Sequence, residues 1–110
     1  MTHDQRALQV WSALVLAARN QQIVSYTTLE DLIGVPRFGL GSILGAVANY
    51  CTRKSFPLLV SIVVSEATGL PGDLYPGDPD PIEIFKARSR AFVFDWLKHE
   101  PPSENDFKQE

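Results

Sequence analysis

The chain has 110 residues, of which 45% are hydrophobic and 21% are charged, with a formal net charge of −3. This length predicts one domain that can bury a core of its own, and the composition excludes an intrinsically disordered chain, a collagen and a coiled coil. The charge is uneven, because residues 1–64 carry five basic and three acidic side chains whereas residues 65–110 carry five basic and ten acidic ones. Nucleic-acid binding rests largely on phosphate neutralisation, so the sequence favours such binding only for the first part of the chain.

The single cysteine, Cys51, cannot form an internal disulfide. It lies in a helical apolar pattern, which favours a buried packing residue over a nucleophile. No stretch resembles a signal peptide or supplies the roughly 20 apolar residues that span a membrane, so we expect a cytoplasmic protein with no membrane partner.

The first predicted element is an amphipathic helix over residues 3–20. Thr2 and Gln5 form a capping box at its start. The apolar residues of this segment recur at helical spacing: Ala7, Trp11, Leu14, Val15 and Ala18.

Two helices joined by a glycine-bearing turn are predicted next. Thr27 and Glu30 form a second capping box after a short β-forming stretch, and residues 34–36 (Gly-Val-Pro) end that helix. A third helix is expected with Ser42 as its cap and with one apolar face made by Ile43, Leu44, Val47 and Cys51. Helix, turn and second helix together give the outline of a helix-turn-helix.

A dense β-branched run predicts a buried strand over residues 56–65. Turn signals at residues 68–72 follow it, and Leu74 and Tyr75 are expected to form a short returning strand. The two strands would make a β-hairpin wing.

A last amphipathic helix is predicted from Asp80 as cap, with Pro81 in its first position, to the proline pair at residues 101–102. Its inward face is expected to hold Ile82, Phe85, Phe92, Val93, Trp96 and Leu97. Residues 103–110 are predicted to be a polar, frayed tail. The expected fold is therefore α+β, a winged helix-turn-helix-like single domain over residues 1–102.

Three segments, residues 23–29 (IVSYTTL), 33–37 (IGVPR) and 56–60 (FPLLV), resemble the DNA-binding domain of alkylguanine-DNA alkyltransferases and of the non-catalytic alkyltransferase-like proteins. That family opens its winged helix with a "valine, threonine, tyrosine, glycine" run and continues with "glycine, x, proline, arginine". The resemblance implies a winged helix that binds DNA.

The same family has a "proline, cysteine, histidine, arginine" active site, and this chain departs from it. Leu58 stands at the alkyl-accepting cysteine and Leu59 at the activating histidine, so the resemblance implies no alkyl transfer. The family's duplex-opening arginine has no counterpart at residues 40–44, so base flipping is not expected. The expected strand and wing, with residues 91–96, also resemble small proteins of phage and restriction-associated loci, which implies no activity.

No enzyme, metal or cofactor is expected. Asp73, Asp78 and Asp80 alternate with proline and glycine as turns and a helix cap require, and His3 and His99 lack partners at metal-ligand spacing. Nothing supplies a nucleophile, a base and an oxyanion site together.

The leading functional hypothesis is binding to double-stranded DNA. Basic residues bracket the expected recognition helix, and Asn49 lies on its expected outer face, where an asparagine can read adenine in a major groove. Polar residues at the start of the second helix are expected to contact phosphate. The candidate nucleic-acid-binding residues are Tyr26, Thr27, Thr28, Arg37, Ser42, Asn49, Arg53 and Lys54.

The rival hypothesis is a protein-interaction module on the same scaffold. The last helix carries more apolar bulk than one face can hide, and the residues expected to face a partner are Ile84, Ala91 and Phe94. A homodimer through the first and last helices is the favoured assembly under this hypothesis. In a third interpretation, Arg37 and Lys54 are plain loop charges and Phe38 fills the core.

Overall fold

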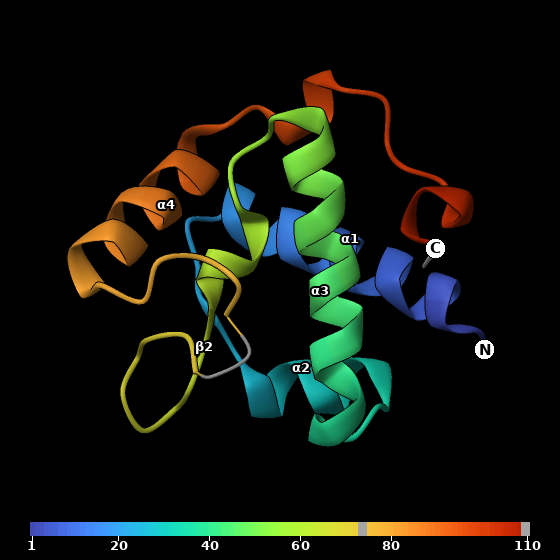
Figure 1. Cartoon of the computed structure of the whole chain (residues 1–110), viewed down its shortest axis with the longest axis horizontal. Helices are drawn as coiled ribbons and strands as arrows, with labels where there is room; N and C mark the ends of the chain where they lie inside the picture. The colour runs from blue at the N-terminus through green and yellow to red at the C-terminus, as the bar shows by residue number, and fades with distance from the viewer. Residues whose placement is uncertain (73–74, 109–110) are drawn as a thin grey trace.

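The computed structural model describes residues 1–72 and 75–108. The helices within them are α1 (His3–Arg19), α2 (Tyr26–Ile33), α3 (Arg37–Lys54) and α4 (Pro81–Val93). The strands are β1 (Val24–Ser25) and β2 (Val63–Val64), and three short 3-10 helices are η1 (Leu59–Ile62), η2 (Trp96–Lys98) and η3 (Glu104–Phe107). α1 passes behind α3, and α2 crosses the lower end of α3 (Figure 1).

The fold is mostly helical with one small parallel sheet, which agrees with the α+β prediction in its coarse form. Val24 of β1 pairs with Val63 of β2, and Ser25 pairs with Val64. β2 therefore pairs with a strand that precedes α2, and the part of the chain that the structure describes holds no hairpin wing. Of the expected returning strand, Leu74 lies outside the described residues and Tyr75 lies in a loop.

The prediction of one strand over residues 56–65 was wrong for most of its length. Residues 59–62 form η1, which begins where the Ser61 N–H donates to the Leu58 carbonyl at 3.1 Å. Every residue from 59 to 64 is buried, so the segment has no inside-outside alternation that would specify a strand. An unbroken apolar run is buried equally well as a strand or as a tight helical turn.

The structure confirms the predicted start of α1 and the predicted end of α2, but it corrects the start of α2. The capping box of Thr2 and Gln5 is present, and Gly34 ends α2 in the left-handed conformation (φ 69°), as predicted. The second capping box was wrong, because the N-cap of α2 is Ser25, whose hydroxyl accepts a hydrogen bond from the Thr28 N–H at 3.1 Å.

α3 begins at Arg37, so Ser42 lies inside this helix and does not cap it. Pro36 precedes the helix with φ −68°, the value that a proline ring imposes and that a helix start accepts. Helix formation through the glycines at 39 and 41 places Leu40 at 0% exposure, and burying this side chain offsets their low helix propensity. α2 and α3 meet at 93° across a three-residue turn.

α4 begins at Pro81 with Asp80 as its cap, as predicted, but it ends at Val93 and its buried face was predicted wrongly. The buried side chains are Ile84, Ala87 and Ala91, and they pack against α1 and η1. Apolar residues occur on all sides of α4, so periodicity could not show which side is buried. The two small alanines on the buried side let the helix backbone approach the core. Consequently Ile84 and Ala91 are core residues and are not available to a partner.

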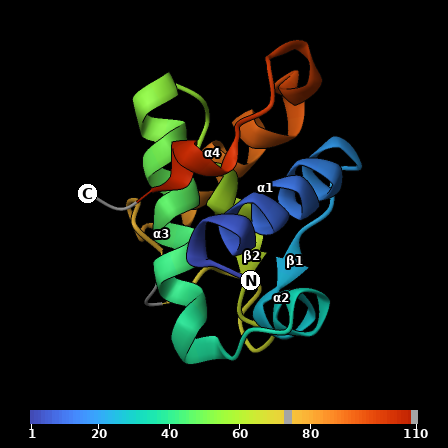
Figure 2. The same ribbon diagram turned by 90° about the vertical axis from the view of Figure 1, so that its right-hand side faces the viewer.

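The end of the chain is not frayed up to Lys108. Ser103 caps η3, and the Phe107 ring is 1% exposed, 5.4 Å from the Tyr50 ring and 6.4 Å from the Trp11 ring between centroids. Figure 2 shows this segment crossing between α1 and α3. The prediction of a polar tail missed it because one aromatic side chain suffices to dock a short segment when the core offers a site for it.

None of the helices within residues 1–72 and 75–108 is by itself long and apolar enough to cross a membrane. α2 and α3 pass that test of length and composition only as a pair, and the pair is bent by 93°.

Candidate nucleic-acid interface

One face of α3 is exposed along its length while the opposite face forms the core. The buried side includes the four residues predicted for it: Ile43, Leu44, Val47 and Cys51. On the outer side Phe38, Ser42, Gly45 and Asn49 follow one another at spacings of four, three and four residues, which places them in one stripe. We call these four residues the α3 stripe.

A groove of about 1080 Å³ lies over the C-terminal two thirds of this stripe. α3 contributes Ser42, Gly45, Asn49 and Arg53 to it, and the segment around η3 contributes Asn105 and Lys108. The structure thus brings together three of the predicted nucleic-acid-binding residues, and it adds a wall from the end of the chain that the sequence did not indicate.

Gly45 forms an open part of this groove. A Cβ atom added at Gly45 would meet nothing within 4 Å. A glycine inside a helix costs about 1 kcal/mol relative to alanine, and close packing does not explain this one. The groove therefore gives direct access to the helix backbone between Ser42 and Asn49.

The cations at the end of α3 are exposed but hold defined positions. The Arg53 guanidinium donates to the Asp106 carbonyl, and both Arg53 and Lys54 lie over the Tyr50 ring, at 6.0 and 5.9 Å from its centroid. The Asp106 carboxylate accepts from the Ser103 backbone N–H at 2.7 Å, so this acid is occupied as a cap. Arg53 and Lys108 therefore line this end of the groove together with the Asp106 carboxylate.

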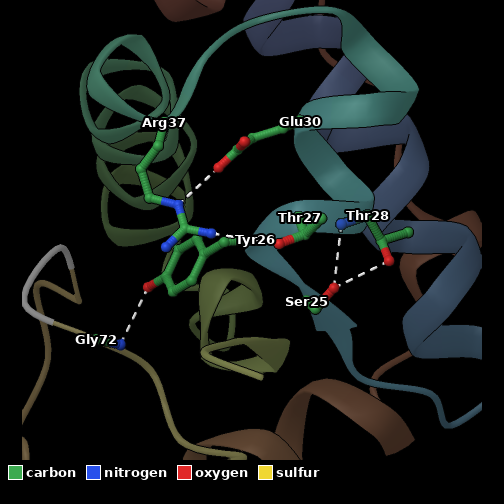
Figure 3. Close-up of polar contacts among 7 residues, drawn as sticks. All are labelled: Ser25, Tyr26, Thr27, Thr28, Glu30, Arg37 and Gly72. Carbon is green, nitrogen blue, oxygen red and sulfur yellow. Dashed lines mark hydrogen bonds and ion pairs between the residues drawn. The ribbon is translucent and has the colours of Figure 1, made fainter. Parts of the chain in front are cut away.

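The residues predicted to bind phosphate at the start of α2 are largely engaged with one another (Figure 3). Arg37 forms an ion pair with Glu30 at 2.6 Å and lies 5.1 Å from the centroid of the Tyr26 ring, and its guanidinium is 3.5 Å from the Thr27 hydroxyl. The Thr28 hydroxyl accepts from Ser25 at 2.9 Å. Since Glu30 neutralises Arg37, this cluster offers less charge to a phosphate than the sequence predicted.

Tyr26 corrects the prediction outright. It is 4% exposed, and its hydroxyl accepts a hydrogen bond from the Gly72 N–H at 3.1 Å. This hydrogen bond holds the loop after β2 against α2. A side chain buried in this way cannot reach a phosphate, so Tyr26 is not a phosphate contact.

Phe94 is half-buried in an aromatic cluster and does not project from α4. Its ring stacks on the His99 ring at 5.0 Å with an interplanar angle of 4°, and the Phe56 ring lies 5.2 Å away. The outward face of α4 instead carries Ile82, Phe85 and Val93, which are 64%, 51% and 80% exposed. The prediction placed these three side chains inside and was wrong for them, whereas Trp96, which was also predicted inside, is buried and Phe92 is partly buried against the core.

The aspartates after β2 serve the backbone. Asp78 accepts from the Asp80 N–H at 3.0 Å, and Asp80 accepts from the Ile82 N–H at 2.8 Å. Asp73 lies outside the described residues. His3 lies 2.9 Å from the Ser42 hydroxyl, and within residues 1–72 and 75–108 no three His, Cys, Asp or Glu side chains gather as metal ligands would.

Cys51 is fully buried, and burial raises the pKa of its thiol to about 11. Only about one thiol in a thousand is therefore ionised at pH 8, and the thiolate is the reactive form. We expect a disulfide reagent to modify the native protein at least about a hundredfold more slowly than the urea-unfolded protein at pH 8. Equal rates in a spectrophotometric thiol assay would contradict the buried position.

No protein-family model, curated protein or solved structure matches this chain.

Proposed function

We propose that this chain is a small, non-enzymatic DNA-binding domain that places α3 against duplex DNA as a recognition helix. The perpendicular α2 and α3, joined by a three-residue turn that begins with a left-handed glycine, match the geometry of a helix-turn-helix. The observation that carries the proposal is the α3 stripe, an outward face on a helix whose other side is core, which presents the Asn49 amide next to the basic end of the helix.

The charge distribution shapes how this domain would bind. Arg53, Lys54 and Lys108 cluster at one end of α3, whereas residues 65–80 after β2 contain acidic side chains and no lysine or arginine. A wing-like loop of that composition would be repelled by phosphate, so binding would depend on α3 and on the neighbouring C-terminal segment. With few phosphate contacts and a net charge of −3, affinity would rest more on base-edge contacts than is usual.

Substitutions at Gly45 test this proposal without disturbing the core. Because space is open at this position, Gly45→Glu and Gly45→Lys should both fold, and the two residues have similar helix propensities. We expect Gly45→Glu to bind a mixed-sequence 20-base-pair duplex at least about tenfold more weakly than Gly45→Lys, because the two side chains repel and attract phosphate at the same place. Fluorescence anisotropy of a labelled duplex measures the difference.

Gly45→Ala is the matched control, and it should stabilise the fold by up to about 1 kcal/mol in urea denaturation. Equal affinities of the Glu and Lys variants would exclude this face of α3 as the contact with DNA. Failure of the unmodified protein to bind any duplex at low salt would exclude the proposal altogether.

A second candidate function is self-association through α4. Ile82, Phe85 and Val93 form an exposed apolar surface on its outer side, and such a surface is typical of an interface. If this function holds, light scattering should show a dimer, and Phe85→Asp should convert it to a folded monomer. Leu32→Asp, at a 65% exposed position on α2, is the control that should remain dimeric. A monomeric unmodified protein would reject this candidate.

A further inference from the structure

Phe38 is the side chain whose position the fold does not explain. It is the second residue of α3 and is 92% exposed, the largest exposed fraction among the large apolar residues of the described chain. The sequence allowed it to fill the core, but the helix begins six residues earlier than predicted and turns it outward. Single exposed apolar side chains are common on protein surfaces, so it is the place of this ring on the helix, and not its exposure alone, that points to a partner.

Its place on the helix suggests which partner. Phe38 belongs to the α3 stripe with Ser42, Gly45 and Asn49, so it faces the same way as the residues of the groove. Phe38 and Asn49 are eleven residues apart, which corresponds to about 16 Å along an α-helix. That length corresponds to about five base pairs of DNA, so the residues at both ends of the stripe can reach base edges within one short site. The small glycine and serine between them let the helix backbone approach the DNA closely.

The chemistry of the stripe matches one kind of base pair. In the major groove only thymine offers an apolar group, its 5-methyl, and a phenyl ring is suited to contact it. Adenine presents an acceptor and a donor that an asparagine amide pairs with in a bidentate way. Guanine is read mainly by arginine and cytosine by carboxylates, and the four residues of the stripe include neither kind of side chain.

We propose that α3 reads A·T base pairs in the major groove, with Phe38 on a thymine methyl and Asn49 on an adenine. This proposal rests on the proposed function and adds its sequence preference. The preference for A·T pairs comes from the Phe38 ring at one end of the stripe and from the Asn49 amide at the other. Each contact can therefore be removed separately, either by a substitution in the protein or by a modified base in the DNA.

The test compares two labelled 20-base-pair duplexes of equal length and charge, one of alternating A·T steps and one of alternating G·C steps. We expect the unmodified protein to bind the A·T duplex at least about tenfold more tightly, since two base contacts distinguish the duplexes. Replacing every thymine by deoxyuridine removes only the methyl group, and it should weaken binding of the unmodified protein severalfold. The same replacement should leave the affinity of Phe38→Ala unchanged.

Asn49→Ala gives the complementary test with 7-deazaadenine, which lacks the acceptor that the amide contacts. The unmodified protein should lose affinity for this duplex, and Asn49→Ala should not. Phe38 and Asn49 are both exposed, so circular dichroism should show that both variants fold normally.

Equal affinity for the two duplexes would overturn the proposal, and so would a Phe38→Ala variant that remains as sensitive to deoxyuridine as the unmodified protein. If the Gly45 variants still differ in such a case, the DNA-binding function stands and only the A·T preference fails. If no duplex binds at all, both proposals fail together.

Discussion

Replacing Phe107 by alanine is expected to lower the free energy of unfolding by about 3–5 kcal/mol, a large share of the total for a domain of this size. Phe107 is 1% exposed and packs against both Trp11 of α1 and Tyr50 of α3. Removing its ring leaves a cavity and also weakens the docking of the segment around η3, which is otherwise held by the buried Pro102 and by the hydrogen bond from Arg53 to the Asp106 carbonyl. Urea denaturation followed by tryptophan fluorescence measures the loss.

Two matched variants define what this result means. Phe107→Leu keeps most of the apolar volume and should cost clearly less than the alanine variant, while Phe38→Ala removes the same ring from a 92% exposed position and should change stability by less than about 0.5 kcal/mol. If Phe107→Ala were as mild as Phe38→Ala, the C-terminal segment would not be docked as the structure has it.

Reversing the charges of Arg53 and Lys54 together is expected to weaken duplex binding at least about a hundredfold at 100 mM salt. Both cations lie at the end of α3 beside the groove and are exposed, so each can approach a phosphate. A plot of log affinity against log salt concentration for the Arg53→Glu, Lys54→Glu double variant should lose roughly 0.9 of slope for each phosphate contact removed. Anisotropy titrations from 50 to 200 mM potassium chloride supply both quantities.

The control is a double variant with the same change in net charge at two lysines outside α3. Lys86→Glu with Lys98→Glu alters α4 and η2 and should leave the salt slope unchanged, although long-range repulsion will weaken binding slightly. Arg53→Gln with Lys54→Gln separates lost attraction from added repulsion. If both charge-reversed doubles weaken binding equally, the contact site is not at the end of α3.

Several features of this fold could be predicted because they depend on neighbours in the sequence. The capping box at Thr2, the left-handed Gly34 and the proline start of α4 each satisfy backbone groups within four residues, so local chemistry is enough to specify them. The buried side of α3 was also predictable, because its large aliphatic residues recur on one face.

The candidate site was predicted in part for a related reason. Asn49 lies opposite the large apolar residues of α3, so its exposure follows from helical spacing, and Arg53 follows it one turn later. Phe38 could not be placed, because its orientation depends on whether the cap of α3 is Pro36 or Ser42. Tyr26 could not be excluded, because its burial depends on Gly72, a residue of a distant loop.

The sequence by itself determined four helices, the start of α1, the end of α2, the start of α4 and the buried face of α3, since these follow from hydrogen bonds and spacings within a few residues. Only the tertiary structure decided that residues 59–62 form a 3-10 helix, that β2 pairs with β1, and which face of α4 is buried. It also decided that Phe107 completes the core and brings Asn105 and Lys108 beside α3. The physical reason is the same in each case: burial of apolar surface is not directional, so when a segment has more than one apolar face the shape of its neighbours makes the choice.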